Sequence, residues 1–152
     1  MPRYESSQTL ATFMRRLAAP FSGFTSQMVP TPDGTVQMSF GQMTFQNHTI
    51  SIALFTRPSD KRDCVVLSRP LFYVPESGTM ELFQQLLIWN NGATESVHFA
   101  VDEPLNTINL VVFRNMEGLN FQEFQLCIEN LMSVAGNCSD RLQPEYGLMR
   151  FM

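Results

Sequence analysis

The stretch MELFQQLLIWNN, residues 80–91, carries apolar residues over too wide an arc for a helix with one buried side. A helix lying on a protein surface buries a single apolar stripe. Here the apolar residues spread over more than one face, so the stretch predicts a helix buried on two sides. One side would meet a sheet, and a second subunit is a natural candidate for the other. The residues expected at this homodimer interface, on the helix and the strand after it, are Phe83, Leu86, Leu87, Trp89, Phe99 and Val101.

The signals at the ends of this helix are a threonine and a glycine. Thr79 is expected to cap the start, and Gly92 to end the helix in the left-handed conformation.

The chain before the central helix predicts one helix and three strands. Residues 7–18 carry an apolar stripe at helical spacing, with Ser6 or Ser7 as cap and Pro20 after the end. Turn residues at 32–34 precede the strands, which are expected near 36–40, 49–56 and 64–74. Pro70 should end the third strand or place it at a sheet edge.

The chain after the central helix predicts two strands and a last helix. The strands fall at 97–101 and 108–113. Asn120 followed by Glu123 is a capping-box signature, and Gly136 is expected to end the helix. The order α-β-β-β-α-β-β-α predicts an α+β fold with a mainly antiparallel sheet packed with helices. We expect one domain over residues 1–136, with 137–152 as a partly loose tail.

The composition excludes several partner classes. A net charge of -4 with no basic stripe argues against nucleic acid. No apolar run reaches the roughly 20 residues of a membrane span, and the first residues carry no apolar signal segment, so a cytoplasmic protein is expected. Cys64, Cys127 and Cys138 are expected to be free thiols.

No set of residues predicts catalysis or a cofactor. His48 and His98 have no acidic neighbours at metal-ligand spacing, and the acids are dispersed. A cysteine nucleophile at Cys64 or Cys127 is the remaining enzymatic reading, but a buried inert thiol is the default. We expect no enzyme activity, no metal and no cofactor.

The predicted strands before the central helix carry more large apolar residues than one sheet face can hide. Ile50, Ile52 and Leu54 can fill the core, which leaves Phe55 on the opposite face. Either the first helix covers that face, or part of it stays open as a groove for a partner's apolar side chains. The residues expected in the groove are Met38, Phe40, Phe45, Phe55, Leu71 and Phe72.

The segment order resembles the class I chaperones of bacterial type III secretion systems, the Tir-chaperone-like family. That family has a first helix of the form L-x-x-F-x-x-x-L, three strands, a leucine-rich helix with Asn near its end, two strands and a final helix. The matching residues are Leu10, Phe13 and Leu17, then Leu82, Leu86, Leu87 and Asn90-Asn91, then Val97, Phe99, Val101 and Asp102, then Leu110 and Val112, and finally Gly118, Leu119, Phe124, Ile128 and Leu131.

The resemblance implies a small acidic cytoplasmic homodimer that uses no ATP. Such a protein would hold the N-terminal segment of a secreted effector in extended form and deliver it to the export apparatus, with the export ATPase as a further candidate partner. The last helix lacks the family's usual aromatic-basic ending, and the loop over residues 21–32 is long. A YbjN-like regulator of the same fold, which sequesters a regulatory protein, therefore stays as the alternative.

Overall fold

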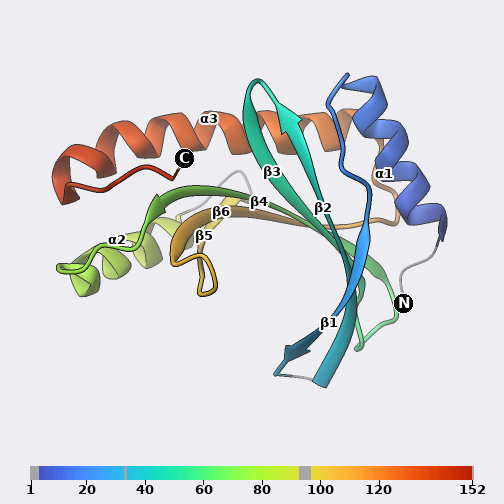
Figure 1. The fold of residues 1–152 in the computed structure, drawn as a ribbon, viewed down its shortest axis with the longest axis horizontal. Coiled ribbons are helices and arrows are strands. Elements are labelled where there is room, and N and C mark those ends of the chain that lie inside the picture. Colours follow the sequence, from blue (N-terminus) through green and yellow to red (C-terminus); the bar gives the residue numbers. More distant parts are fainter. Residues whose placement is uncertain (1–3, 33, 93–96, 152) are drawn as a thin grey trace. The chain divides into compact units, whose positions relative to one another are not determined.

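The computed structural model describes residues 4–32, 34–92 and 97–151. It contains a six-stranded sheet in the order β1-β2-β3-β4-β6-β5, and the pairs β1–β2, β2–β3 and β5–β6 are antiparallel (Figure 1). The predicted α+β fold is confirmed. The elements are α1 (Tyr4–Arg16), β1 (Thr25–Thr31), β2 (Gly34–Phe45), β3 (His48–Thr56), β4 (Asp63–Tyr73), α2 (Thr79–Asn91), β5 (Val97–Asp102), β6 (Thr107–Asn115) and α3 (Phe121–Tyr146).

Strand β1 is the element that the sequence did not predict. Apart from the half-buried Val29, its residues are polar or exposed, and Pro30 interrupts them, so apolar and polar residues do not alternate. The strand is formed by its pairing with β2, in which Thr25 lies opposite Phe40 and Thr31 opposite Gly34. β1 is consequently an edge strand of the sheet. Asp33 of the predicted turn lies outside the described residues.

The chain divides into two compact units, each made of two chain segments. Unit 1 comprises residues Met1–Leu67 and Phe113–Leu126, and unit 2 comprises Ser68–Val112 and Cys127–Met152. Strands β4 and β6 and helix α3 contribute residues to both units. The single domain over 1–136 stays a prediction.

The core of unit 1 is built from one face of β3 and the apolar stripe of α1. Ile50, Ile52 and Leu54 are completely buried, as expected. Phe13 of α1 is also buried, and its ring centroid lies 5.4 Å from that of Phe124 at the start of α3. The predicted caps of α1 were wrong, because the helix begins at Tyr4 and Ser6 and Ser7 lie inside it.

A close approach next to β2 requires a glycine. A Cβ on Gly41 would lie 2.6 Å from the Phe21 ring and 2.7 Å from the Gly23 carbonyl oxygen. Phe21 bridges to Met43, one residue out of register with the pairing of β1 to β2. This shift is a bulge before β1, and Gly23 adopts the left-handed φ of 84° that it needs.

The core of unit 2 contains one side of α2, and both predicted end signals of this helix were wrong. Leu82 and Leu86 are buried. The residue before the helix, Gly78, provides no side-chain cap. Gly92 has φ -94°, outside the left-handed region, and its N–H bonds to the Trp89 carbonyl, so the last turn closes without the left-handed residue.

Two further predictions failed in the second half of the chain. β4 continues through Pro70 to Tyr73, and in the sheet order it lies between β3 and β6. Just past the strand, Val74 N–H donates to Asn106 O at 2.9 Å, so the pairing on the β6 side continues beyond the proline. Helix α3 starts at its predicted cap, where Glu123 N–H donates to Asn120 Oδ1 at 2.8 Å. It does not end at Gly136 but runs to Tyr146. The expected tail supplies buried residues, namely Cys138, Leu142 and Leu148.

Candidate protein-binding surfaces

An apolar hollow of about 250 Å³ opens on unit 2 between α2 and β5. Five of the six residues predicted for a dimer interface line it, and the sixth, Trp89, stands beside it with its ring centroid 6.0 Å from that of Phe99. The guanidinium of Arg141, from α3, lies over the Trp89 ring, with its Cζ atom 4.8 Å from the ring centroid. The lining residues are Phe83, Leu86, Leu87, Asn90, Phe99, Ala100 and Val101.

The hollow has apolar rims that face solvent. Leu87 is 64% exposed on the α2 side and Val101 is 48% exposed on the β5 side. A large apolar side chain at this exposure gains free energy when a partner covers it. The placement of these residues is what a self-complementary interface needs, but their role in a dimer stays a prediction.

Asn90 lines this hollow and bonds to the backbone of Phe99, a contact that the sequence did not predict. Phe99 N–H donates to Asn90 Oδ1 at 2.7 Å, and Asn90 Nδ2 donates to Phe99 O at 3.2 Å. The side chain therefore pairs with β5 as a neighbouring strand would, and joins the end of α2 to the sheet. In the sequence, Asn90 matches only the asparagine that the chaperone-like pattern has near the end of its central helix.

The second surface is the face of β2 and β3 in unit 1 that points away from the core. Met38 lies opposite Phe55 in the register, and Phe40 opposite Ala53, so the three large residues share one face. All three are half-buried. The Phe113 ring extends the patch, with its centroid 6.3 Å from that of Phe55. We call Met38, Phe40, Phe55 and Phe113 the Phe55 face.

Helix α1 lies on the other side of the strands. Ser6 of α1 donates to Asp63 Oδ2 at 2.6 Å, and Thr56 donates to Oδ1 of the same carboxylate at 2.7 Å. Thr56 shares its side of β3 with the buried Leu54, because alternate residues of a strand point to the same face. Helix α1 therefore covers the core face and not the Phe55 face.

The six residues predicted for an effector groove do not form one surface. Phe45 pairs with His48 and so falls on the face opposite to Phe55. Leu71 and Phe72 belong to unit 2, where Leu71 is buried and Phe72 is completely so. Only Met38, Phe40 and Phe55 are brought together. A groove contributed by all six residues stays untested, and the buried pair would need to move to meet a partner.

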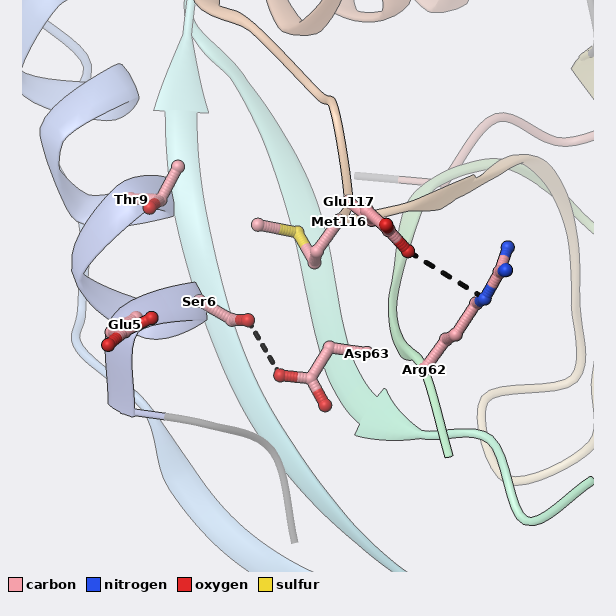
Figure 2. Close-up of a pocket in the computed structure, with 7 residues that line it drawn as sticks. All are labelled: Glu5, Ser6, Thr9, Arg62, Asp63, Met116 and Glu117. Carbon is pink, nitrogen blue, oxygen red and sulfur yellow. Dashed lines mark hydrogen bonds and ion pairs between the residues drawn. The ribbon is translucent and has the colours of Figure 1, made fainter. Parts of the chain in front are cut away.

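A polar pocket of about 310 Å³ lies in unit 1 beside the first turns of α1 (Figure 2). Asp63 is buried at its floor and accepts the two hydroxyl hydrogen bonds described above. Arg62 forms an ion pair with Glu117 at 3.7 Å across the opening. These polar groups bond within the chain, so we interpret the pocket as a connection between α1, the start of β4 and the loop that follows β6. Its lining residues are Glu5, Ser6, Thr9, Arg62, Asp63, Met116 and Glu117.

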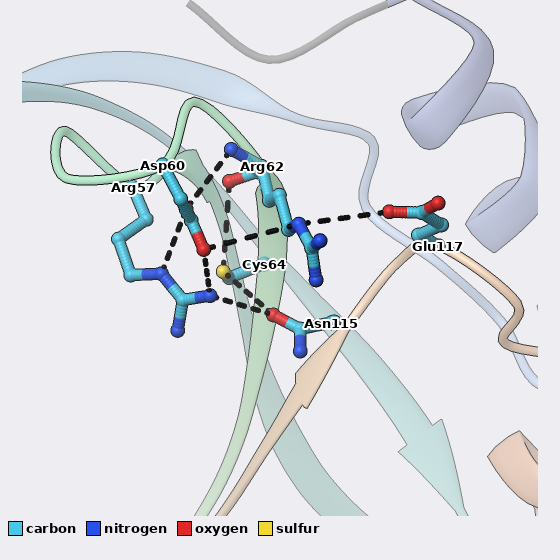
Figure 3. A network of polar contacts seen from close by, with 6 residues as sticks. All are labelled: Arg57, Asp60, Arg62, Cys64, Asn115 and Glu117. Carbon is cyan, nitrogen blue, oxygen red and sulfur yellow. Dashed lines mark hydrogen bonds and ion pairs between the residues drawn. The ribbon is translucent and has the colours of Figure 1, made fainter.

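A polar network closes the β3–β4 turn next to this pocket (Figure 3). Arg57 binds Asp60 through both carboxylate oxygens, with Nε to Oδ1 at 3.0 Å. The Arg57 hydrogen bond lowers the pKa of Asp60 to about 2, and the same bond raises the pKa of Arg57. Arg57 Nη2 also reaches Asn115 Oδ1 at 3.4 Å, which ties the turn to the end of β6.

Neither histidines nor cysteines gather into a reactive site in the described part of the chain. Cys64, Cys127 and Cys138 are buried thiols that form no disulfide with one another, and burial raises the pKa of the Cys64 and Cys138 thiols. Within residues 4–32, 34–92 and 97–151, no three His, Cys, Asp or Glu residues are placed to hold a metal ion. None of the helices described there is both long and apolar enough to cross a membrane.

Comparison with known proteins finds similarity at the level of structure. No family profile matches the sequence, and no curated protein does. A solved structure, the crystal structure of the ExsC-ExsE complex, contains a chain that is 20% identical. The two chains superpose with a TM-score of 0.59 over 91% of this chain and 92% of that one. At this identity the similarity shows that the two chains share a fold.

Proposed function

We propose that this chain is a cytoplasmic type III secretion chaperone, which binds the N-terminal segment of an effector in extended form and keeps it competent for export. The observation that carries the proposal is the Phe55 face, an apolar sheet surface that α1 leaves uncovered, in the same sheet as the exposed edge strand β1. An extended segment can pair its main chain with a sheet edge and place alternate side chains on such a surface.

The energies are adequate for this task. Covering one large apolar side chain is worth roughly 1.5–3 kcal/mol. A folded domain is stable by only about 5–15 kcal/mol, so a few such contacts compete with the folding of a client segment. No nucleotide is needed, because binding alone shifts the equilibrium toward the extended form.

We propose that the working unit is a homodimer formed across the hollow between α2 and β5. The exposed rims at Leu87 and Val101 support this, because one two-fold interface would cover the same apolar patch on both copies. The solved chain of similar fold was crystallised in a complex of two proteins, and this supports a binding role here.

The test is co-expression with N-terminal segments of candidate effectors, followed by size-exclusion chromatography. The wild type should elute with a segment bound, and Phe55→Glu should lose it while remaining folded. Leu126→Glu is the matched control, because Leu126 is also exposed and in unit 1 but lies on α3. Recovery of a regulatory protein in place of any effector segment would contradict the secretion role and favour the regulator of the same fold.

A further inference from the structure

The chain after α3 folds back and adds itself to the sheet within unit 2. Gly147 has the left-handed φ of 61° that reverses the chain at the helix end. Leu148 N–H then donates to the Gln143 carbonyl at 3.3 Å, and the Leu148 side chain is buried. The following residues run back from the end of α3, drawn in red in Figure 1.

This returning segment pairs with the end of β4. Tyr73 N–H donates to Met149 O, and Phe151 N–H donates to Leu71 O, both at 3.0 Å. Phe72 and Arg150 are thereby antiparallel partners. The N–H groups of successive residues in a strand point to opposite edges. Val74 N–H donates to Asn106 on the β6 side, so Tyr73 N–H, and the returning segment that it binds, lie at the edge of β4 that faces away from β6.

Few contacts hold residues 149–151 against β4. Met149 is 71% exposed, and the Phe151 ring packs against the Tyr73 ring at a centroid distance of 5.5 Å. Arg150 points back to α3, where its Nε donates to Gln143 Oε1 at 2.8 Å. Two main-chain hydrogen bonds and one partly exposed ring pair can be exchanged for equivalent contacts from another strand at little net cost.

We propose that the β4 edge at Leu71–Tyr73 is a second docking site for an extended peptide segment, which the chain's own residues 149–151 occupy until a partner segment replaces them. The chemistry of the site defines the partner. It must be extended, carry an aromatic side chain where Phe151 lies to stack on Tyr73, and have no proline there, since that N–H binds Leu71 O. The identity of the partner as a client segment rests on the proposed function, whereas the exchange itself does not.

The first experiment uses a fluorescent peptide with the sequence of residues 147–151, GLMRF, titrated against full-length protein by anisotropy. Phe151→Pro removes the N–H that binds Leu71 and should open the edge. Arg150→Pro is the matched control, because an Arg150 N–H points away from β4 in this pairing. The peptide should bind Phe151→Pro at least tenfold more tightly than the wild type or Arg150→Pro. Equal affinity for all three proteins would overturn the proposal, as would equal binding of the peptide GLMRP.

A second measurement covers the case in which Phe151→Pro does not fold. In wild-type protein, amide hydrogen exchange at Phe151 should accelerate at least tenfold when the unlabelled GLMRF peptide is in excess, since the resident segment is displaced. The Tyr73 amide should stay protected, because the incoming strand takes over its hydrogen bond. No change at Phe151 under excess peptide would show that the segment is not exchangeable. Either failure leaves the Phe55→Glu test of the proposed function unaffected.

Discussion

Asn90 holds the backbone of Phe99 at both of its hydrogen-bonding groups, with distances of 2.7 and 3.2 Å. The amide thus occupies part of the open edge of β5 and fixes α2 against the strand. Because Leu87 and Val101 form the rims of the hollow between these elements, the geometry of the hollow depends on this contact.

Replacing Asn90 tests that dependence. Asn90→Ala leaves two backbone groups of Phe99 without their partner and should lower the free energy of unfolding by about 1–3 kcal/mol. Asn90→Asp keeps the acceptor for the Phe99 N–H but turns a second carboxylate oxygen toward the Phe99 carbonyl oxygen, so it should cost at least as much stability as alanine at neutral pH while it still protects the Phe99 amide. Urea denaturation measures both, and hydrogen exchange at the Phe99 amide should accelerate only in the alanine variant. An alanine variant as stable as the wild type would show that the contact does not fix the helix.

Two glycine-to-alanine changes should have opposite effects. Gly41→Ala places a methyl 2.6 Å from the Phe21 ring and 2.7 Å from the Gly23 carbonyl, so we expect a loss of about 1–3 kcal/mol. Gly136→Ala has open space around it inside α3 and should gain about 0.5–1 kcal/mol through helix propensity. Thermal denaturation of the two variants should bracket the wild type. A neutral Gly41→Ala would contradict the close approach of Phe21 to β2.

Glutamate at Phe72 and at Phe55 should separate a core position from a surface one. Phe72 is completely buried, so Phe72→Glu removes core packing and buries a charge, which should cost more than about 3 kcal/mol and unfold the chain. The sequence prediction placed Phe72 in an open groove, where a charged side chain would be tolerated. Phe55 is half-buried on an uncovered face, so Phe55→Glu should keep the wild-type circular dichroism spectrum. A folded Phe72→Glu variant would contradict the placement of β4.

The Arg57–Asp60 ion pair should make the free energy of unfolding depend on pH. The pKa of Asp60 is about 2 in the folded chain, below its ordinary 3.8, so the contribution of this carboxylate is present above its unfolded value and lost as the pH falls toward 2. Both partners are largely solvated, so the effect should be small. The difference in urea midpoint between wild type and Asp60→Asn should be visible near pH 6 and vanish near pH 2. A difference that persists unchanged at the acidic end would rule out this pair as its source.

The position of the dimer interface can be tested with two neighbouring residues of α2. Leu87 and Ile88 are 64% and 63% exposed, but only Leu87 lines the hollow. Leu87→Asp should therefore give a monomer that is still folded, and Ile88→Asp should leave the dimer intact. Sedimentation velocity of both variants measures their oligomeric state. If Ile88→Asp dissociates the protein and Leu87→Asp does not, the interface lies on another side of the helix.

The sequence predicted those elements whose own residues repeat with a helical or strand period. The stripe of α1, the buried face of β3 and the Asn120 cap of α3 are of this kind. β1 was missed because its residues are polar and its pairing with β2 supplies the order. The end of α3 was misplaced because Gly136 faces open space, where a glycine is tolerated inside a helix, and because Leu142 beyond it is buried.

The same distinction, between local patterns and contacts set by tertiary structure, applies to the candidate surfaces. Five of the six residues expected at an interface line the α2–β5 hollow, because the excess of apolar residues on a single helix is visible in the sequence, and their role in a dimer stays a prediction. In the set around Phe55, strand register places Phe45 on the opposite face, and the binding role of the set also stays a prediction. The contact of Asn90 with Phe99 and the pairing of residues 149–151 with β4 depend on tertiary structure and have no local signature.

We propose that two copies of this chain hold an extended segment of another protein. Light scattering measures the mass of this complex, with the wild type purified with a bound effector segment at tens of micromolar. We predict a particle with the mass of two chains of 17.3 kDa each together with the segment. A particle with the mass of one chain, from which the segment has separated, would contradict the account.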